Sequence, residues 1–331
     1  MKITMAHGSG GEETEKLISR IFAAHFQNEI LDEMEDAAAV PGAERLALTT
    51  DSFVVEPLVF PGGDIGKLGV CGTVNDLLMR GAVPKYLTCG FILEAGTDAA
   101  VVEQAAASMA QAAAEAGVLI VAGDTKVVEN AHEAGGIVIN TAGVGFLHRD
   151  VQITPSGIRP GDCLILSGSL GDHHAAILSA RMRIENHIRS DVGLLTEPVS
   201  ILLGEKLAVH AMRDVTRGGL ATILSEFAKR SGLTMRIRES ALPVHPEVRD
   251  FCGILGLDPL TMGNEGKFVA AVDAADAETA LKLIRDTACG REAVIIGEVT
   301  ERAEVPVILE TKIGGERVVT PLTGEGLPRI C

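Results

Sequence analysis

Residues 63–82, GDIGKLGVCGTVNDLLMRGA, space their apolar side chains as an α-helix does. One polar pair, Asn75 and Asp76, interrupts the apolar pattern. A solvated helix surface does not explain such a pair, whereas a bound metal ion would neutralise the carboxylate and satisfy its oxygens. The flanking segments 45–55 and 85–94 are patterned as strands. The stretch therefore predicts an apolar helix between two strands, carrying a functional carboxylate.

The alternation of strand and helix patterns continues outward from this helix. An Ala-rich helix is expected over 97–117, and strands over 118–128 and 135–147. A turn-rich stretch with two prolines and two glycines then separates the two halves of the chain, at 148–162. The second half shows strand patterns at 163–171, 267–273, 293–300 and 305–311, and helix patterns at about 199–209, 220–231 and 277–286.

These patterns predict an α+β fold with two domains of similar size. Residues 1–35 form a Gly-rich segment and a helix, 36–148 the first domain, 149–322 the second domain, and 323–331 a tail. The tail, TGEGLPRIC, is rich in Gly and Pro, which disfavour helix and strand, so we expect it to be flexible. It ends on Cys331, whose thiol fits no core pattern.

Composition narrows the class of partner. The formal net charge of −16 argues against binding to nucleic acid or to an anionic membrane. A phosphate ligand would therefore need a divalent metal ion to mediate its contacts. The chain shows no signal peptide and no run of about 18 apolar residues. The six cysteines show no zinc spacing and are typical of a reduced, cytoplasmic protein.

Several polar or Gly-rich segments suggest sites for anions and metal ions. Asp36 and Asp51 could join Asp76 around Mg²⁺, although an Asp at a strand end is often only a cap. HGSGG at 7–11 could bring backbone N–H groups to an anion, or could simply be a floppy N-terminus. AGDTKVV at 122–128 presents a lysine for a phosphate, or an edge-strand Lys–Asp pair.

Three further segments lie in the second half of the chain. SGSLGDHH at 167–174 follows the strand–loop–helix logic of phosphate binding, but it lacks the Gly-Lys-Ser/Thr ending of a Walker A loop. MRDVTRGGLA at 212–221 predicts a helix start that favours anions. In MGNEGK at 262–267, Glu265 stands between flexible positions as either a turn residue or a catalytic carboxylate.

Taken together, these motifs resemble the ATP-binding superfamily of aminoimidazole ribonucleotide synthetase, selenophosphate synthetase and thiamine-monophosphate kinase. Within it, AHGSGG at 6–11 and PRIC at 328–331 resemble the HypE family of hydrogenase-maturation carbamoyl dehydratases. Residues 6–13 contain neither Cys nor Lys, which argues against selenophosphate synthesis. The motifs occur in the order Asp36-Ala37-Ala38, Thr50-Asp51, Asn75-Asp76, Gly123-Asp124-Thr125-Lys126, Gly168-Gly171-Asp172, Asp214-Thr216-Arg217-Gly218-Gly219 and Gly263-Asn264-Glu265.

The resemblance implies a homodimer whose N-terminal sheets pair into a barrel, a C-terminal α/β sandwich domain, and ATP with Mg²⁺ between the domains. It also implies that HypF loads a carbamoyl group onto Cys331, that ATP-dependent dehydration yields a thiocyanate, and that cyanide reaches the iron of NiFe hydrogenase through HypC and HypD. The implied metal ligands are Asp36, Asp51, Asp76 and Asp214. The implied ATP-binding residues are Gly8, Gly10, Gly11, Thr50, Asn75, Asp124, Thr125, Gly168, Gly171, Asp172, Thr216, Arg217, Gly218 and Gly219.

The implied catalytic residues are Cys331, Glu265, Lys126 and His7. Lys126 would stabilise the γ-phosphate or the carbamoyl oxygen. Glu265 is the first candidate for the base and His7 the second, since a histidine titrates near neutral pH. Two other functions stay open at this point: a kinase-like enzyme with a free small substrate, and an ATP-dependent scaffold whose tail is a docking peptide.

Overall fold

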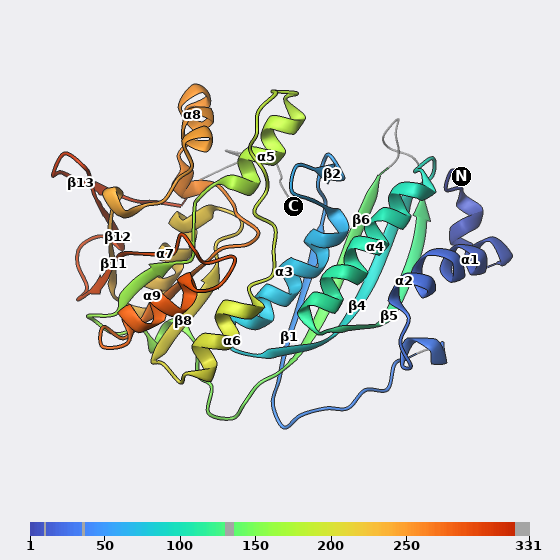
Figure 1. Ribbon diagram of the computed structural model, residues 1–331, viewed down its shortest axis with the longest axis horizontal. Coiled ribbons are helices and arrows are strands. Elements are labelled where there is room, and N and C mark those ends of the chain that lie inside the picture. Colours follow the sequence, from blue (N-terminus) through green and yellow to red (C-terminus); the bar gives the residue numbers. More distant parts are fainter. Residues whose placement is uncertain (10, 35–36, 130–135, 322–331) are drawn as a thin grey trace.

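The computed structural model describes residues 1–9, 11–34, 37–129 and 136–321. Two β-sheets, each covered by helices, lie side by side (Figure 1). This arrangement confirms the predicted two-domain α+β fold. In the described part of the chain, no helix is long and apolar enough to cross a membrane.

The first sheet has the strand order β1-β6-β4-β5. Strand β1 pairs antiparallel with β6, β6 antiparallel with β4, and β4 parallel with β5. A two-stranded hairpin, β2–β3, precedes the first long helix. The bounds are β1 Leu46–Phe53, β2 Val59–Phe60, β3 Gly63–Asp64, β4 Val83–Glu94, β5 Leu119–Val128 and β6 Ile137–Phe146.

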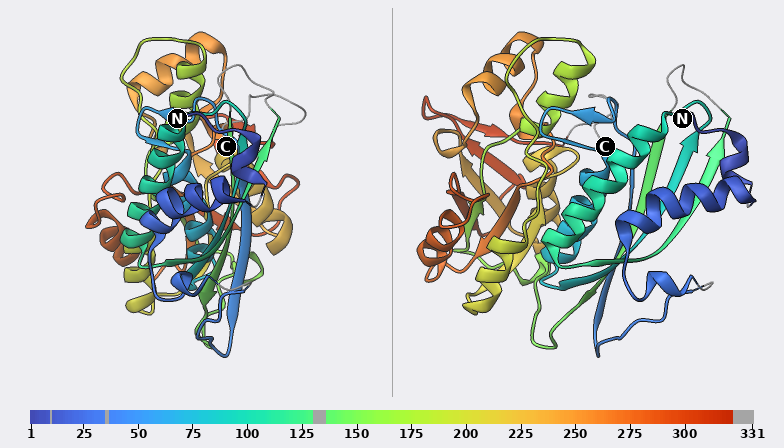
Figure 2. Two further views of the ribbon diagram at one scale, coloured as in Figure 1. Left: turned by 90° about the vertical axis from the view of Figure 1, so that its right-hand side faces the viewer. Right: turned by 45° about the vertical axis from the view of Figure 1, so that its right-hand side comes forward.

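Helices α3 (Ile65–Met79) and α4 (Ala99–Ala116) lie on one face of this sheet (Figure 2). Each begins with an aspartate whose carboxylate accepts a backbone N–H of the first turn, Asp64 for α3 and Asp98 for α4. The N-terminal segment packs beside β5 and α4. It contains η1 (Met5–Gly8), α1 (Glu12–Leu17), the π-helical turn η2 (Ile18–Ala23), α2 (Ala24–Phe26) and η3 (Leu31–Glu33).

The opposite face of the first sheet is open and partly apolar. Along β1, alternate residues are exposed, and Leu48 is 72 % exposed. The strand register places Leu48 beside Val144, and Val144 beside Tyr86. Paired residues share a face of the sheet, so an apolar surface runs across three strands here.

The second sheet has seven strands in the order β13-β12-β9-β11-β7-β10-β8, and only the β12–β9 pair is parallel. Its strands are β7 Cys163–Leu166, β8 Val209–Asp214, β9 Thr234–Arg238, β10 Phe268–Val272, β11 Val294–Thr300, β12 Val307–Glu310 and β13 Glu316–Val318. The α-helices of this half are α5 Asp172–Arg181, α6 Thr196–Gly204, α7 Gly219–Ser231, α8 Pro246–Leu255 and α9 Ala277–Arg285. The remaining turns of 3₁₀-helix are η4 Pro155–Gly157, η5 Glu239–Ala241 and η6 Pro259–Thr261.

One hydrophobic cluster spans both halves of the described chain, and α3 is central to it. Thirteen of the 15 residues of α3 are buried. The helix contacts β1, β6 and α4 on its own side and β8 and α6 of the second half. Val70 and Val74 therefore belong to the same apolar cluster as Val199 and Met212.

Several elements differ from the sequence prediction. The helix expected over 199–209 is the shorter α6, and its last predicted residue begins strand β8. Strand β9 and helix α8 were not predicted. Helix α8 begins at Pro246, which suits the first helical position, and ends before Gly256 in the left-handed conformation, so local signals for it existed.

Candidate active site

A cavity of about 310 Å³ lies between the two domains. Strand β1 and helix α3 supply one wall, and β8, α7 and the loop before β10 supply the other. Its lining includes Thr50, Asp51, Gly72, Asp76, Arg213, Asp214, Thr216, Arg217, Thr222, Ile223, Glu226 and Glu265. Segments that are far apart in the sequence thus bring their carboxylates to one cavity, which we call the interdomain pocket.

A tight turn aims the start of helix α7 at this pocket. Strand β8 ends at Asp214, and Gly218 and Gly219 both have positive φ. A Cβ on Gly219 would lie 2.5 Å from the carbonyl oxygen of Leu260, so only glycine fits there. Because the N–H groups at a helix N-terminus carry partial positive charge, the turn offers an anion site beside Thr216 and Arg217.

Three aspartates line the interdomain pocket. The Thr49 hydroxyl donates to Asp76 Oδ2 at 2.7 Å, and the Ser52 N–H donates to Asp51 Oδ1 at 2.9 Å. Arg217 Nη2 lies 3.9 Å from Asp51 Oδ1. Burial raises the pKa of Asp51, and burial followed by repulsion from Asp76 raises the pKa of Asp214 to about 7. The cluster therefore carries more negative charge than its surroundings neutralise.

Glu265 completes the carboxylate set. Its side chain is only 4 % exposed, yet it reaches the lining of the pocket. Burial, then repulsion from Asp214 and Asp191, raises its pKa well above the usual range. A raised pKa makes a carboxylate, once ionised, a stronger base, as a general base requires.

The donor set suits Mg²⁺ shared with a phosphate. The aspartates offer oxygen ligands, which Mg²⁺ prefers. Among the described residues, only Asp162, His210 and Asp273 bring three candidate ligand atoms within 4.8 Å of one another. That trio lies at the other end of strands β7, β8 and β10, away from the pocket.

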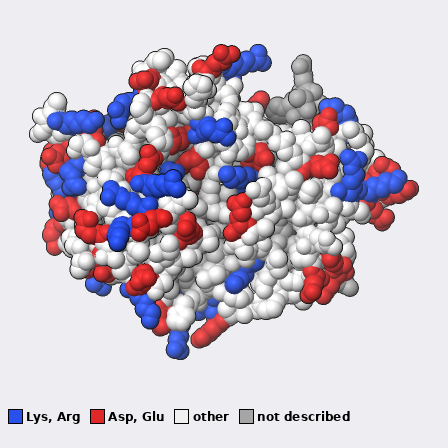
Figure 3. Space-filling view, in the orientation of Figure 1, with Lys and Arg blue, Asp and Glu red and all other residues white. Residues whose placement is uncertain are grey.

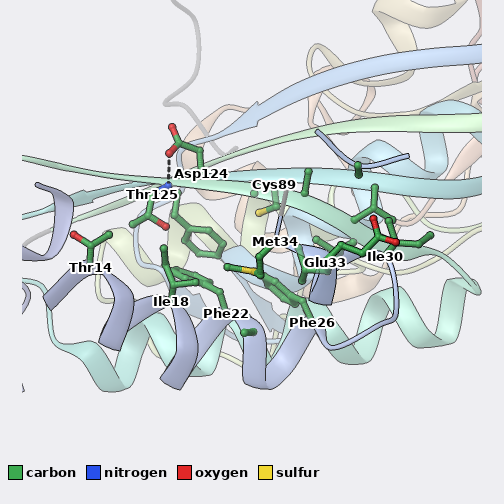
Figure 4. A pocket seen from close by; sticks show the side chains of 18 of the residues that line it. Thr14, Ile18, Phe22, Phe26, Ile30, Glu33, Met34, Cys89, Asp124 and Thr125 are labelled. Atoms are coloured by element: carbon green, nitrogen blue, oxygen red, sulfur yellow. Dashed lines mark hydrogen bonds between the residues drawn. The ribbon is translucent and has the colours of Figure 1, made fainter. Parts of the chain in front are cut away.

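A second cavity, of about 430 Å³, lies between strand β5 and the N-terminal helices (Figure 4). Ile18, Phe22 and Phe26 form one wall, and Cys89 and Phe91 of β4 contribute to the opposite wall. The Phe22 and Phe91 ring centroids are 4.7 Å apart. This cavity, which we call the β5 pocket, has an apolar and aromatic lining whose chemistry suits a planar base.

The polar residues of β5 divide between the two faces of the sheet: Thr125 points toward the N-terminal helices, and Asp124 points away from them (Figure 4). Asp124 Oδ1 accepts the Thr125 N–H, and Asp124 Oδ2 lies 3.6 Å from Lys126 Nζ. Lys126 is 65 % exposed and so is free to reach a ligand. A Cβ on Gly8 would lie 2.6 Å from the Val127 nitrogen, so a glycine lets the N-terminal segment lie against β5.

The two pockets lie at opposite edges of the first sheet. Strand β1 borders the interdomain pocket, β5 borders the other, and two strands separate them. At about 4.8 Å per strand, this places the two edge strands about 14 Å apart. The register pairs Asp124 with Gly90 and Lys126 with Ile92, so both side chains share the open face of the sheet.

Other predicted site residues lie in neither pocket. Asn75 is buried, and its amide hydrogen bonds go to the backbone of Gly193 and Leu195. His7 Nδ1 accepts the Thr4 N–H at 3.0 Å, within the N-terminal turn on the β5 side. Gly11 is the cap residue before α1. The predicted residues Gly10, Asp36 and Cys331 lie outside the described residues.

The Gly-rich loop before α5 is likewise turned inward. The Gly171 N–H donates to Asn264 Oδ1 at 2.8 Å, and a Cβ on Gly168 would meet the Lys267 side chain. Asp172 accepts hydrogen bonds from Ser169 and His245. These contacts fix the loop at the base of the Glu265 segment, and its predicted phosphate contact stays a prediction.

Sequence reasoning missed several lining residues. Arg213 lies between buried residues on β8 and pairs with Glu226 at 3.2 Å. In the sequence this position looked like an ordinary exposed strand residue. Thr222 lies one turn into α7, where a helix start at Gly219 could have indicated it.

On the face shown in Figure 3, Lys and Arg lie among the acidic side chains, so the excess negative charge forms no single patch there.

Two family models match the chain. Residues 34–147 match the N-terminal domain of AIR synthase related proteins, and residues 159–310 match their C-terminal domain. The fold and the interdomain pocket therefore define an AIR synthase related protein.

More similar relatives narrow this class. The chain is 49 % identical over its whole length to the carbamoyl dehydratase HypE of Cupriavidus necator, covering 95 % of that protein. A crystal structure of the hydrogenase maturation protein HypE in complex with ATP matches with a TM-score of 0.95 and 44 % identity, over 99 % of both chains. A structure of a HypE–HypF complex matches with a TM-score of 0.81 and 45 % identity, over 92 % of this chain and 99 % of that one. The chain belongs to the HypE family of carbamoyl dehydratases, which are hydrogenase maturation proteins.

The raised pKa of Asp214 predicts a pH-dependent cost in stability. The unfolded carboxyl titrates near 3.8 and the folded one near 7, so between these values the native state binds more protons than the unfolded state. Stability therefore falls as pH rises through this window. Without metal, Asp214→Asn should raise the free energy of unfolding at pH 8 by roughly 2–4 kcal/mol, and by less at pH 5.5.

Urea unfolding in EDTA at both pH values measures this difference. Asp250→Asn, at an exposed position on α8, is the matched control and should change stability little at either pH. Equal stability of Asp214→Asn and wild type at pH 8 would show that the folded carboxyl is not under this electrostatic cost.

Proposed function

We propose that this protein dehydrates an S-carbamoyl group on Cys331 to a thiocyanate at the expense of ATP, and so supplies the cyanide ligand of NiFe hydrogenase. The observation that carries the proposal is the interdomain pocket, in which buried Glu265 faces three aspartates and the start of α7. Membership of the HypE family supports this reaction over the kinase-like and scaffold alternatives.

The reaction needs a better leaving group than hydroxide. Transfer of the γ-phosphoryl group of ATP to the carbamoyl oxygen forms an O–P bond and releases ADP. Cleavage of the C–O bond then releases inorganic phosphate, which carries the oxygen away. The nitrogen loses two protons as the C≡N bond forms, so S–C(=O)NH₂ and ATP become S–C≡N, ADP and phosphate.

Residues of the interdomain pocket match these needs. Asp51, Asp76 and Asp214 would hold Mg²⁺, with Asp36 as a further ligand expected from the sequence. Mg²⁺ bound there would neutralise charge on the transferring phosphoryl group. The start of α7 and Arg217 supply positive charge for phosphate oxygens.

Glu265 is the proposed base. Its raised pKa makes the Glu265 carboxylate, once ionised, a stronger base toward the carbamoyl nitrogen. His7, the second candidate, lies on the β5 side of the sheet, and its Nδ1 is occupied by Thr4. Within one chain, Glu265 alone of the two reaches the carboxylate cluster.

Cys331 is proposed to carry the substrate between sites. The eight residue steps from Thr323 span at most about 26–29 Å, enough for the thiol to visit two active sites. Tethering also raises the local substrate concentration, to the millimolar range for a short flexible link. The known HypE–HypF complex supports HypF as the carbamoyl donor enzyme. Transfer to HypC and HypD, and a cytoplasmic location, stay predictions.

We further propose that a homodimer completes the ATP site. The β5 pocket would hold the adenine, while the carboxylates that need the phosphates lie at the other edge of the same sheet. The open apolar face around Leu48 needs a cover, and Asp124 and Lys126 project from this face. A second copy on that face would bring Lys126 of one chain toward Glu265 of the other.

The role of Cys331 predicts a defined mass change. Wild-type protein incubated with carbamoyl phosphate, ATP and HypF should gain one carbamoyl group on its C-terminal peptide and then lose one water. Removal of Cys331 should leave ATP binding intact and abolish both changes, because the thiol is the attachment atom. Mass spectrometry of the peptide measures both steps, and hydrogenase maturation by the truncated protein would contradict the mechanism.

Glu265→Gln should bind ATP normally and fail to dehydrate. Glutamine keeps the shape of the side chain but cannot accept the proton. The carbamoylated tail should therefore persist in the presence of ATP, which peptide mass spectrometry detects. Asp162→Asn, a buried carboxylate outside both pockets, is the control. Normal conversion by Glu265→Gln would assign the base to another residue.

The shared site predicts complementation between inactive chains. A purified heterodimer of Lys126→Ala and Glu265→Gln chains should regain about half of the wild-type activity, because one of its two sites is intact. The reciprocal control places both substitutions on one chain and pairs it with wild type; that heterodimer should be inactive. The opposite pattern, or a monomer mass in light scattering, would contradict the shared site.

A further inference from the structure

The loop 191–195 holds the backbone of Glu265 from both sides. The Glu265 N–H donates to Asp191 Oδ1 at 3.1 Å, and the Gly266 N–H donates to Asp191 Oδ2 at 3.2 Å. The Gly193 N–H donates to the Glu265 carbonyl at 3.3 Å. Both polar groups of the Glu265 backbone are thus fixed by a segment about 70 residues away in the chain.

This approach leaves no room for a side chain at position 266. A Cβ there would lie 2.0 Å from the Asp191 carbonyl oxygen. Gly266 is therefore required for the two loops to touch backbone to backbone. The glycine of the MGNEGK motif is therefore explained by the close approach of the loop 191–195 and not by a need for flexibility.

Asn75 ties the same loop to the first domain. Its Nδ2 donates to the Gly193 carbonyl at 3.0 Å, and its Oδ1 accepts the Leu195 N–H at 2.9 Å. Asn75 precedes Asp76 on helix α3, so one helix carries both a pocket carboxylate and the anchor of the loop. The connection runs from α3 through the loop to Glu265.

A lysine balances the charge at the centre of this connection. Lys267 Nζ lies 3.7 Å from Asp191 Oδ2, and the two side chains are 12 % and 5 % exposed. The Asp191 carboxylate therefore has a backbone partner on each oxygen and a cation beside it. A buried carboxylate kept in this way is costly to build and is typical of a fixed geometric requirement.

We propose that Asp191 and Asn75 are positioning residues that set the place of Glu265 relative to the aspartates across the domain boundary. The inference rests on the proposed function, because it assumes that the Glu265 carboxylate acts on the substrate. Neither side chain lines the interdomain pocket, so both act through the Glu265 backbone. Displacement of a catalytic group by about 1 Å can cost about 10²-fold in rate.

Asp191→Asn tests this role. Asparagine has one side-chain oxygen, so it can accept only one of the two backbone N–H groups of Glu265 and Gly266. Lys267 also loses its counter-ion, so the Glu265 segment should shift. In single turnover of carbamoylated protein with ATP, the dehydration rate should fall by about 10²-fold while the dissociation constant for ATP stays near that of wild type. A general loss of folding would weaken ATP binding as well, so it would not lower the dehydration rate alone.

Asp162→Asn is the matched control. Asp162 is also buried, accepts a backbone N–H from Arg159 at 2.9 Å, and pairs with His210 at 2.8 Å, but it lies away from the Glu265 segment. It should lower the thermal midpoint about as much as Asp191→Asn and leave the dehydration rate unchanged. An equal loss of rate in both variants would reduce Asp191 to a structural residue and overturn the proposal.

Asn75→Ala acts on the same loop without disturbing Lys267. Combined with Asp191→Asn, its effect on the rate should be much less than additive, because both variants release the same segment. Glu265→Gln, measured in parallel, separates the two hypotheses. Full activity of Glu265→Gln would show that Glu265 is not the base. An inactive Glu265→Gln beside a fully active Asp191→Asn overturns only the positioning role.

Discussion

Burial of helix α3 on all sides is the constraint on which the two-domain arrangement depends. Its contacts with β1, β6 and α4 build the first domain, and its contacts with β8 and α6 fix the second domain against it. Close approach is possible because the helix carries glycines where neighbours press on it. A Cβ on Gly66 would lie 2.0 Å from the Ala105 carbonyl oxygen, and one on Gly72 would lie 2.8 Å from the Phe53 ring. The position of Asp76 relative to Asp214 follows from this packing.

The pocket at the end of this packing is electrostatically costly. Desolvated carboxylates repel one another there, and the raised pKa values of Asp51, Asp214 and Glu265 report that cost. Stability given up at a site is a common mark of function, and a cation bound at this pocket would recover part of it. Hydrogen bonds from the loop 191–195 hold the backbone of Glu265 in place.

The sequence predicts which carboxylates line the interdomain pocket. It does not predict that Lys126 and Glu265 lie at opposite edges of the first sheet. Asp51, Asp76, Asp214 and Glu265 stand in motifs whose apolar context marks them, so their convergence was predictable. The strand order was not, because pairing β1 with β6 and β4 with β5 depends on contacts far apart in the sequence. The order places Lys126 across the sheet from Glu265. Local sequence could not show that the amide of Asn75 bonds to the backbone of Gly193 and Leu195. Asp191 stands in no recognisable sequence motif, because its hydrogen-bond donors are the backbone N–H groups of distant residues.

The central place of α3 also has a consequence for how the chain is made. Met79 leaves the ribosome long before Asp214, the end of the strand that covers the far side of the helix. At typical elongation rates the interval is roughly ten to thirty seconds. During that time the side of α3 that will meet β8 and α6 lacks its cover, even after β6 has emerged and completed the first sheet. The nascent first domain is therefore a natural client for chaperones that shield apolar helices, and slow translation between the two halves would extend its exposure.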